Sequence, residues 1–367
     1  MRIATIVGAR PQFVKAAAVS RAIQSTRGLE EILVHTDQHY VDNMSPIFFE
    51  ELEIPAPDIN LGIGSGPHGA QTGKMLGAVE KVLLELGPDW VLVYGDTNST
   101  MAGSLAAAKM HIPVAHVEAG LRSFNRRMPE EINRVITDHL SVLLFAPTQT
   151  AVDNLRAEGL DGEHLHRVGD VMYDAALYYG KKAERRKKIL QTLGLTEGNY
   201  VVATIHRPEN TDDRKRLKAI LGGLEKLAKD IRVVLPLHPR TRKKLDDMGG
   251  VGEMAPHVSA IEPQGYLDML ALEKCCCLVA TDSGGVQKEA FFYEIPCVTL
   301  RDETEWVELV ENGWNRVVPP RSADQVFGAL RKAIGSRGKA CHPFGQGDAA
   351  EKIVGILSDP PEETDAE

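Results

Sequence analysis

The sequence contains no run of about 18 to 20 apolar residues, which is the length that a membrane-spanning helix needs. Aromatic residues are scarce, at 5% of 367 residues, whereas 43% of the chain is hydrophobic and 25% is charged. This composition excludes collagen-like and intrinsically disordered chains. Basic residues do not outnumber acidic ones, since the net charge is −9 and the pI is near 5.8. We therefore expect no membrane partner and no nucleic-acid partner.

Cysteine is also scarce, and its spacing fits neither a disulfide framework nor a metal site. The five cysteines form one consecutive triplet and two isolated residues: Cys275, Cys276, Cys277, Cys297 and Cys341. We expect free thiols in a reducing compartment, with the triplet packed as small apolar side chains in a buried strand. The first residues, MRIATIVGARPQ, lack the apolar core and cleavage site of a secretory signal, and they predict a strand that runs into a loop.

Short apolar runs alternate with helix-length amphipathic segments along the chain. Strands are expected at residues 3–7, 32–36, 91–95, 113–118, 143–147, 200–206, 233–238, 278–282 and 297–300. Helices are expected between them, for example at residues 71–86, 100–110, 130–141 and 215–229. Almost continuously apolar strands that alternate with helices predict parallel sheets covered on both faces, an α/β fold. The length is too great for one core and predicts two such doubly wound domains.

We place the boundary between the domains at residues 168–169, so that the first domain is 1–168 and the second is 169–345. The chain from residue 358, SDPPEETDAE, is acidic and contains proline, and we expect it to be disordered. In doubly wound sheets, ligands bind beyond the carboxyl ends of the strands. Two such domains facing a cleft would hold a small-molecule site between them.

The segment after the first expected strand has the features of an anion-binding turn. Gly8 permits a tight turn, and Arg10 and Lys15 could meet an anion at the N-terminus of the following helix. Neither a G-x-G-x-x-G fingerprint nor a P-loop is present, so dinucleotide and P-loop chemistry are not indicated. A structural turn with solvated charges is an equally good interpretation.

A second such turn follows the expected strand at 278–282. A hydroxyl and free N–H groups at a helix start suit a phosphate, and the residues are Ser283, Gly284 and Gly285. Glu289, further along that helix, could accept hydrogen bonds from ribose hydroxyls. An ordinary N-cap by Asp282 or Ser283 is the alternative. We favour the phosphate because two glycines exceed what a cap requires.

Three carboxylates come at or just after strand ends or at a helix start: Asp96, Glu118 and Glu130. We expect them to point into one crevice, with Arg122 nearby. Gathered carboxylates repel one another, which raises the pKa of at least one and lets an acid and a base coexist. Glu130 and Glu131 could instead simply complement the dipole of the helix that begins at Pro129.

Two histidines, His206 and His238, end expected strands and are followed closely by Arg207 and Arg240. A single histidine at a strand end is more often structural than catalytic. Two of them beside arginines favour anion binding, and His206 is the better candidate. The residues alone therefore allow a reaction that uses side-chain carboxylates on a phosphorylated or nucleotide substrate.

Nine segments carry a resemblance to a known family, in family order from residue 5 to about 310: GARPQFVK, TDQH, VYGDTNST, HVEAGLRS, PEEINR, TIHRPEN, LPLHPR, DSGGVQKEA and RDETEWVEL. The chain resembles the non-hydrolysing UDP-N-acetylglucosamine 2-epimerases. The resemblance implies two Rossmann-like domains of the glycosyltransferase-B type, with a C-terminal helix in residues 346–367 that returns to the first domain. It also implies a cytoplasmic homodimer that acts on a UDP-sugar and needs neither a metal nor a redox cofactor.

The resemblance assigns roles by position. Asp96, Glu118, Glu130 and His206 look like the catalytic residues of the family. The positions that look like its substrate and UDP contacts are Arg10, Lys15, His206, Gln264, Ser283, Gly284, Gly285 and Glu289. The chemistry implied is anti elimination of UDP across C1–C2, which gives a 2-acetamidoglucal, followed by re-addition with C2 inverted. A glycosyltransferase of the same architecture is the alternative, but it has no need for three clustered carboxylates.

The chain departs from the general family pattern at several positions, among them three that change a charge. Gln12 and Lys288 stand where the pattern has glutamate, and Trp306 stands where it has arginine. With NMSPIFFEEL and TEWVELV, these features resemble a subgroup that acts on UDP-2,3-diacetamido-2,3-dideoxyglucuronate. These changes would make the pocket more positive, and a more positive pocket would suit a uronate carboxylate. Lys288 could equally face solvent on the outside of its helix.

Overall fold

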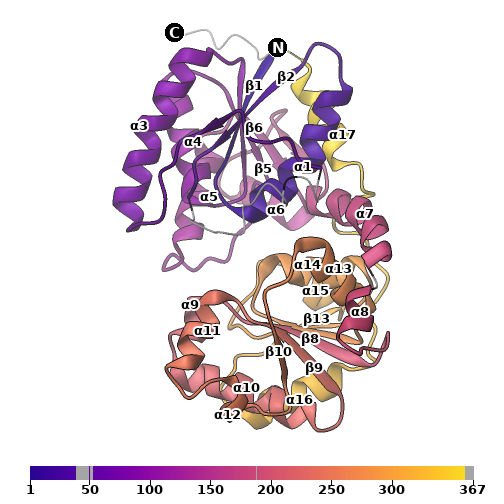
Figure 1. Ribbon diagram of the computed structural model, residues 1–367. Helices are drawn as coiled ribbons and strands as arrows, with labels where there is room; N and C mark the ends of the chain where they lie inside the picture. Colours follow the sequence, from indigo (N-terminus) through magenta and orange to yellow (C-terminus); the bar gives the residue numbers. More distant parts are fainter. Residues whose placement is uncertain (39–48, 50–52, 187, 360–367) are drawn as a thin grey trace. The chain divides into compact units, whose positions relative to one another are not determined.

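The computed structural model describes residues 1–38, 49, 53–186 and 188–359, and the chain divides into two compact units (Figure 1). Unit 1 comprises Met1–Ala175 and His342–Glu367, and unit 2 comprises Ala176–Cys341. The boundaries differ from the expected 168–169 and 345–346. The first one falls inside a continuous helix, α7 (Val171–Ala183), so no break in composition marks it.

Some segments discussed above lie outside the described residues. They are residues 360–367 of the acidic tail, His39 of the TDQH segment, and all of NMSPIFFEEL except Phe49. Among the helices of the described part of the chain, none is long and apolar enough to cross a bilayer.

Unit 1 is built on a seven-stranded parallel sheet with the strand order β3-β2-β1-β4-β5-β6-β7. Its strands are β1 (Arg2–Val7), β2 (Glu30–His35), β3 (Ile59–Asn60), β4 (Trp90–Tyr94), β5 (Val114–Val117), β6 (Leu143–Ala146) and β7 (Leu165–Arg167). Its helices are α1 (Arg10–Ser25), α3 (His68–Leu86), α4 (Asn98–Lys109), α5 (Pro129–Leu140), α6 (Gln149–Ala157), the start of α7, and α17 (Ala349–Leu357). The last helix packs against α1, as Figure 1 shows.

Unit 2 is built on a six-stranded parallel sheet with the order β10-β9-β8-β11-β12-β13. Its strands are β8 (Tyr200–Thr204), β9 (Arg232–Pro236), β10 (Ser259–Ile261), β11 (Leu278–Thr281), β12 (Cys297–Thr299) and β13 (Asn315–Val317). Its helical elements after α7 are η1 (Glu184–Arg186), α8 (Lys188–Thr192), α9 (Pro208–Thr211), α10 (Arg214–Ala228), α11 (Pro239–Asp246), α12 (Val251–Met254), α13 (Tyr266–Cys275), α14 (Gly284–Phe292), α15 (Val307–Glu311) and α16 (Ala323–Ala333). The prediction of two doubly wound α/β domains of the glycosyltransferase-B type is confirmed.

The strand order reverses at one place in each sheet. In unit 1 this switch lies between β1 and β4, and in unit 2 it lies between β8 and β11. The chain leaves adjacent parallel strands in opposite directions at such a place, which opens a crevice at their carboxyl ends. The segments that leave these four strands begin at Gly8, Gly95, Ile205 and Asp282. Most of the candidate residues lie on these segments or in the helices that follow them, whereas Glu118 follows β5, Glu130 is in the first turn of α5, and Gln264 follows β10.

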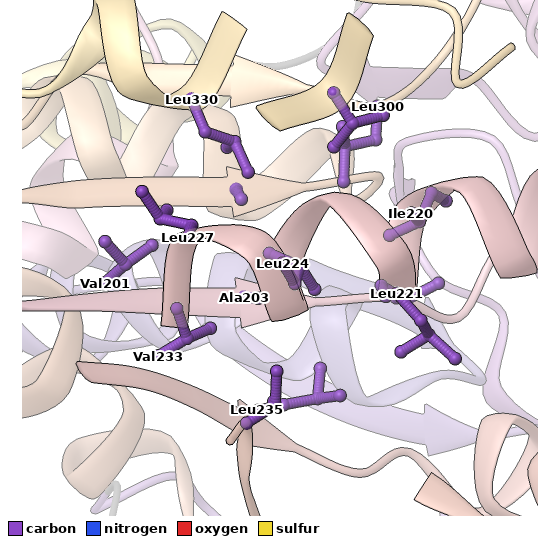
Figure 2. Packing of buried hydrophobic residues seen from close by; sticks show 14 of the residues in the cluster. Val201, Ala203, Ile220, Leu221, Leu224, Leu227, Val233, Leu235, Leu300 and Leu330 are labelled. Carbon is purple, nitrogen blue, oxygen red and sulfur yellow. The ribbon is translucent and has the colours of Figure 1, made fainter. Parts of the chain in front are cut away.

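The central strands are buried on both faces, which explains their unbroken apolar sequence. In unit 2, Leu217, Ile220, Leu221, Leu224 and Leu227 of α10 recur at helical spacing and pack onto β8 and β9. Figure 2 shows this packing against Val201, Ala203, Val233 and Leu235. A helix with this pattern gains its stability from the apolar face that it buries.

Two expectations about local structure need correction. The expected strands did not include the outer strands β3, β7, β10 and β13. Each of these has only two or three residues, too few to form a recognisable apolar run. The cysteine triplet does not lie in a strand, because Cys275 ends α13 and Cys276 caps it, ahead of β11. The Cys276 and Cys277 thiols donate to the carbonyls of Glu273 and Tyr200, and none of the five cysteines, all of which lie in the described residues, forms a disulfide.

Candidate active site

The loop from β1 into α1 is held by the side chain of Gln12. Its Oε1 accepts hydrogen bonds from the N–H groups of Gly8 (2.8 Å) and Ala9 (3.1 Å). Its Nε2 donates to the carbonyl of Tyr94 (2.8 Å) and to Thr100 Oγ1 (2.9 Å). Gln12 is buried and all these bonds are internal, so it ties the β1 loop to the β4 loop. Among the described residues, the contacts of Gln12 are those of a residue that fixes these loops.

Lys15, Glu118 and the loop after β4 come together in unit 1. The Lys15 ammonium lies 2.8 Å from each Glu118 carboxylate oxygen. A Cβ at Gly95 would lie 3.2 Å from that ammonium and 3.8 Å from Glu118 Oε1. Glu118 adopts a left-handed backbone conformation (φ 74°), which is uncommon for a residue with a side chain and is frequent at functional sites. Lys15 is thus paired with a carboxylate before any substrate anion arrives.

Asp96 is held by α5. Its carboxylate accepts from Arg134 Nη2 at 2.5 Å, and its carbonyl accepts from Asn133 Nδ2 at 2.9 Å. Glu130 lies in the first turn of this same helix, after Pro129, and is partly exposed. Sequence reasoning missed Arg134, although it ends the PEEINR segment that carries Glu130. Helix α5 therefore carries Glu130 and also holds Asp96, whose carboxylate is paired with the Arg134 cation.

Two neighbouring charges have structural roles. Arg122 is buried and pairs with Asp138 and Glu158, so the expectation that it lies beside the three carboxylates is not supported by its contacts. Glu131 accepts from the N–H and Oγ–H of Ser123 and from the N–H of Phe124, which fixes the loop before α5. Arg10 is the first residue of α1 and is partly exposed.

In unit 2, Asp282 organises the end of β8. This buried carboxylate accepts from the backbone N–H groups of His206 (3.0 Å) and Arg207 (3.1 Å), and from Asn210 Nδ2 (3.0 Å). His206 Nδ1 lies 3.2 Å from Asp282 Oδ1. Burial alone would raise the pKa of Asp282, but hydrogen bonds and the charge of His206, with the other donors, hold it below its usual value.

An ionised Asp282 can only accept, so it keeps the proton of His206 on Nδ1. When the ring is neutral, Nε2 is then an acceptor, and no residue of the described chain bonds to it. About a third of this side chain (35%) is exposed. His206 can therefore take or give a proton, or contact a phosphate, through Nε2.

His238 and Arg240 have other partners. His238 Nδ1 accepts from the Arg240 N–H at 3.2 Å, and the ring lies 5.6 Å from that of His206. Burial, with the nearby His206, lowers the pKa of His238 and favours its neutral form. The Arg240 guanidinium pairs with Asp212, so its contacts do not support the expected anion site.

The turn before α14 is a capped helix start that also presents donors. Ser283 Oγ accepts from the Val286 N–H at 3.5 Å, so the N-cap interpretation holds for Ser283. The N–H groups of Gly284 and Gly285 have no acceptor among the described residues. Both can bind an anion, and the helix N-terminus favours negative charge there.

Trp306 contacts this turn, and Lys288 packs on Trp306. The Trp306 indole N–H donates to the Gly284 carbonyl at 3.0 Å, and the Lys288 ammonium lies 4.2 Å from the indole ring centroid. Lys288 is only 2% exposed, so the interpretation in which it faces solvent is wrong. Its helix is buried on several sides, since Gln287, Glu289 and Ala290 are also buried. A cation over an indole face is stabilised by the ring quadrupole.

The remaining candidates also lie in unit 2. Glu289 is buried. The burial of Glu273, together with the negative charge of Glu289, raises the pKa of Glu273 well above its usual value. Gln264 lies between β10 and α13, is partly exposed, and donates from Nε2 to the Glu262 carbonyl at 2.6 Å.

The chain was compared with known proteins. The family model described as UDP-N-acetylglucosamine 2-epimerase matches residues 21–358. A UDP-2,3-diacetamido-2,3-dideoxy-D-glucuronate 2-epimerase of Pseudomonas aeruginosa is 50% identical over 366 residues (98% of this chain, 99% of that protein). A UDP-N-acetylglucosamine 2-epimerase homolog of Methanococcus maripaludis is 49% identical over 360 residues (97% and 99%).

The crystal structure of Methanocaldococcus jannaschii UDP-GlcNAc 2-epimerase, in complex with UDP-GlcNAc and UDP, has a TM-score of 0.91 at 45% identity. The match covers 98% of this chain and 99% of that one. The match to the family model, the identity to curated relatives and the shared fold agree with one another. The chain therefore belongs to the UDP-N-acetylglucosamine 2-epimerase family, a family of isomerases that act on nucleotide sugars.

Proposed function

We propose that this protein inverts C2 of a UDP-sugar by anti elimination of UDP and re-addition. A carboxylate takes the proton from C2, the C1–O bond breaks, and its electron pair leaves with UDP. The C1–C2 double bond of a 2-acetamidoglucal forms. Re-addition of UDP with protonation on the opposite face completes the inversion. The observation that carries the proposal is the gathering of Glu118, Lys15 and the Asp96 loop at the switch point of unit 1.

The candidate residues divide this work between them. Asp96, Glu118 and Glu130 serve as the acid–base groups, because proton transfer by a positioned carboxyl group accelerates such steps by about 10²- to 10⁴-fold. In unit 2, the Gly284 and Gly285 amides, the Ser283 hydroxyl and His206 Nε2 receive the diphosphate. Donors and a helix N-terminus stabilise the charge that develops as UDP departs.

Arg10, Lys15, Gln264 and Glu289 complete the proposed substrate contacts. Arg10 and Lys15 add positive charge for the diphosphate, and Glu289 accepts from the ribose hydroxyls. We assign Gln264 to the same UDP site. Each of these assignments predicts weaker UDP binding after substitution by alanine, measured by calorimetry.

Turnover in deuterated water tests the mechanism. Elimination gives the C2 proton to an exchangeable carboxyl, so the product should carry solvent deuterium at C2 by proton NMR. Retention of the original hydrogen throughout turnover would contradict the elimination. Transfer of the sugar to an acceptor, with no epimer formed, would instead indicate a glycosyltransferase.

We further propose UDP-2,3-diacetamido-2,3-dideoxyglucuronate as the sugar nucleotide. The 50% identity to the Pseudomonas aeruginosa relative and the buried Lys288 cation beside the Gly284 turn support it. The uronate should have a higher kcat/KM than UDP-N-acetylglucosamine in direct competition. Lys288→Met should narrow that preference by about 10- to 100-fold, with Lys288→Arg as the charge-preserving control. Better use of the neutral sugar would refute this choice.

We also propose a homodimer, working in the reducing cytoplasm. Unit 1 exposes large apolar side chains on and beside α5: Phe124 (77%), Ile132 (47%), Ile136 (37%) and Val142 (42%). Exposed apolar surface of this kind favours association between subunits. If this surface forms the dimer interface, Ile136→Lys should shift the sedimentation velocity towards that of the monomer. The absence of disulfides among the five described cysteines fits a reducing compartment. Alkylation of all five thiols in freshly lysed cells would agree with this location, and disulfides would contradict it.

A further inference from the structure

A buried histidine in unit 1 has no role in the proposed chemistry. His116 belongs to β5, two residues before Glu118, and its side chain is completely buried. Its Nε2 lies 2.7 Å from the carbonyl oxygen of Gly95, the residue before Asp96. Its Nδ1 lies 2.7 Å from Asp138 Oδ1 in α5. One imidazole therefore bridges the loop after β4 and the helix α5.

The chemistry of the two partners fixes the protons on this ring. A carbonyl oxygen can only accept, so Nε2 of His116 must carry a proton. The other oxygen of Asp138, Oδ2, accepts from the Arg122 guanidinium at 2.7 Å and from the Gly120 N–H at 3.1 Å, and these donors favour the ionised carboxylate. It too can only accept, and Nδ1 must also carry a proton. In a neutral ring, one of the two nitrogens would have no proton, and its lone pair would face the lone pair of the Gly95 carbonyl oxygen or of Asp138 Oδ1.

Further charges compensate this buried cation. Asp138 Oδ2 accepts from Arg122 Nη1 (2.7 Å) and from the Gly120 N–H (3.1 Å). Arg122 in turn makes a two-point contact with Glu158, at 2.7 Å for each bond. Positive and negative groups alternate along this chain of His116, Asp138, Arg122 and Glu158. The buried imidazolium is thus paired and hydrogen-bonded, as a buried charge must be.

At its other end, this series of contacts reaches the backbone that carries Asp96, through His116. Gly95 is left-handed (φ 63°), and its carbonyl points to His116. The peptide between Gly95 and Asp96 could rotate if this carbonyl lost its donor. Asn133 and Arg134 hold the carbonyl and the carboxylate of Asp96 on the other side of that peptide. His116 supplies the third contact, and with it the direction in which Asp96 points.

We infer that His116 is a permanent imidazolium and a positioning residue, which fixes the Gly95 carbonyl and thereby aims the Asp96 carboxylate. The role of Asp96 rests on the proposed function. The protonation state does not, so the two can be tested separately. The groups that face His116 are Asp138 from α5 and, behind it, Arg122.

The first experiment is histidine nitrogen NMR on the full-length protein. An exposed histidine loses its second proton well below about pH 9, because its ordinary pKa is near 6.5. We expect one imidazolium with both nitrogens protonated to persist at that pH. Its signals should vanish in His116→Gln and remain in His139→Gln, an exposed histidine of α5. A wild-type spectrum with no imidazolium at about pH 9 overturns the inference, whether or not the variant folds.

The second experiment separates positioning from folding. His116→Gln keeps one donor but loses the charge, and small misplacement of a catalytic group lowers rates by up to about 10²-fold. We expect kcat to fall by about that factor, with KM, UDP affinity and the folded fraction little changed, and His139→Gln to match wild type. A folded variant with normal kcat would overturn the positioning role. Absence of C2 exchange in the wild-type protein would refute the proposed function, while the imidazolium spectrum would still stand.

Discussion

Replacement of Asp282 by asparagine should change the proton of His206 rather than the shape of the site. The two oxygens of Asp282 share the His206 backbone N–H, at 3.0 Å from Oδ1 and 3.1 Å from Oδ2. Oδ1 also faces His206 Nδ1, whereas Oδ2 also accepts from the Arg207 N–H and Asn210 Nδ2. An amide NH₂ at the Oδ2 position would meet three donors. At the Oδ1 position it meets only the shared His206 N–H, which can still bond to the oxygen at Oδ2, and it can donate to His206 Nδ1, provided that the ring moves its proton to Nε2. Asp282→Asn should therefore adopt this second arrangement.

The expected magnitudes follow from that exchange. Most hydrogen bonds are kept but lose their charge assistance, so the free energy of unfolding should fall by only about 1 to 2 kcal/mol. The His206 Nε2 changes from acceptor to donor and can no longer receive a proton, so kcat should fall by about 10²- to 10⁴-fold. Epimer formation by proton NMR measures the rate, and histidine nitrogen NMR reports the tautomer.

The pH dependence gives an independent test. The pKa of Asp282 is lowered in the folded protein, so its ionised form contributes stability that is present above the unfolded pKa of about 3.9. That contribution is lost as the pH falls through the folded pKa. The stability difference between wild type and Asp282→Asn should therefore shrink in acid. A variant with normal kcat, or with Nε2 of His206 still unprotonated, would refute the reasoning.

Three further changes have defined outcomes. Glu130→Gln removes a proton-transfer group and nearly keeps its shape, so kcat should fall by about 10²- to 10⁴-fold while calorimetry shows unchanged UDP affinity; normal turnover would remove Glu130 from the catalytic set. Burial raises the pKa of Asp174 to about 6, so the protonated carboxyl contributes stability that is lost as the pH rises through that value. Asp174→Asn should therefore stabilise the protein at pH 8 by about 1 to 3 kcal/mol in urea unfolding, because the amide stays neutral and its oxygen can still accept from the Ala350 N–H. Equal urea midpoints of wild type and variant at pH 8 would contradict this. Gly8→Ala would place a Cβ 1.9 Å from Ser99 Oγ and should lower stability by about 2 kcal/mol or more, with partial recovery by Ser99→Ala.

The parts of the fold that bury a strand on both faces could be read from the sequence, and the rest could not. Nine central runs were predictable because each is an unbroken apolar segment followed by a polar turn. The cysteine triplet was misplaced because α13 continues the apolar spacing of Leu267, Leu270 and Ala271 into Cys275. Lys288 was ambiguous because α14 is buried on several sides and shows no polar face.

The candidate site divides in the same way. Asp96, Glu118 and Ser283 could be found because they stand at the ends of strands or at a helix start, which is a local feature. Their partners are tertiary: Arg134 reaches Asp96 across 38 residues, and Lys15 reaches Glu118 across 103. Sequence spacing carries no signal for such pairs without a known fold.

Unit 1 is built from two stretches of the chain that are separated by all of unit 2. Its second stretch brings α17 onto α1, and the Ala350 N–H donates to Asp174 at 2.7 Å. During synthesis, which proceeds at about 5 to 20 residues per second, the first stretch must wait for the last to leave the ribosome. Unit 2 is continuous and has no such delay. The later half of the polypeptide therefore completes its native contacts before the earlier half does.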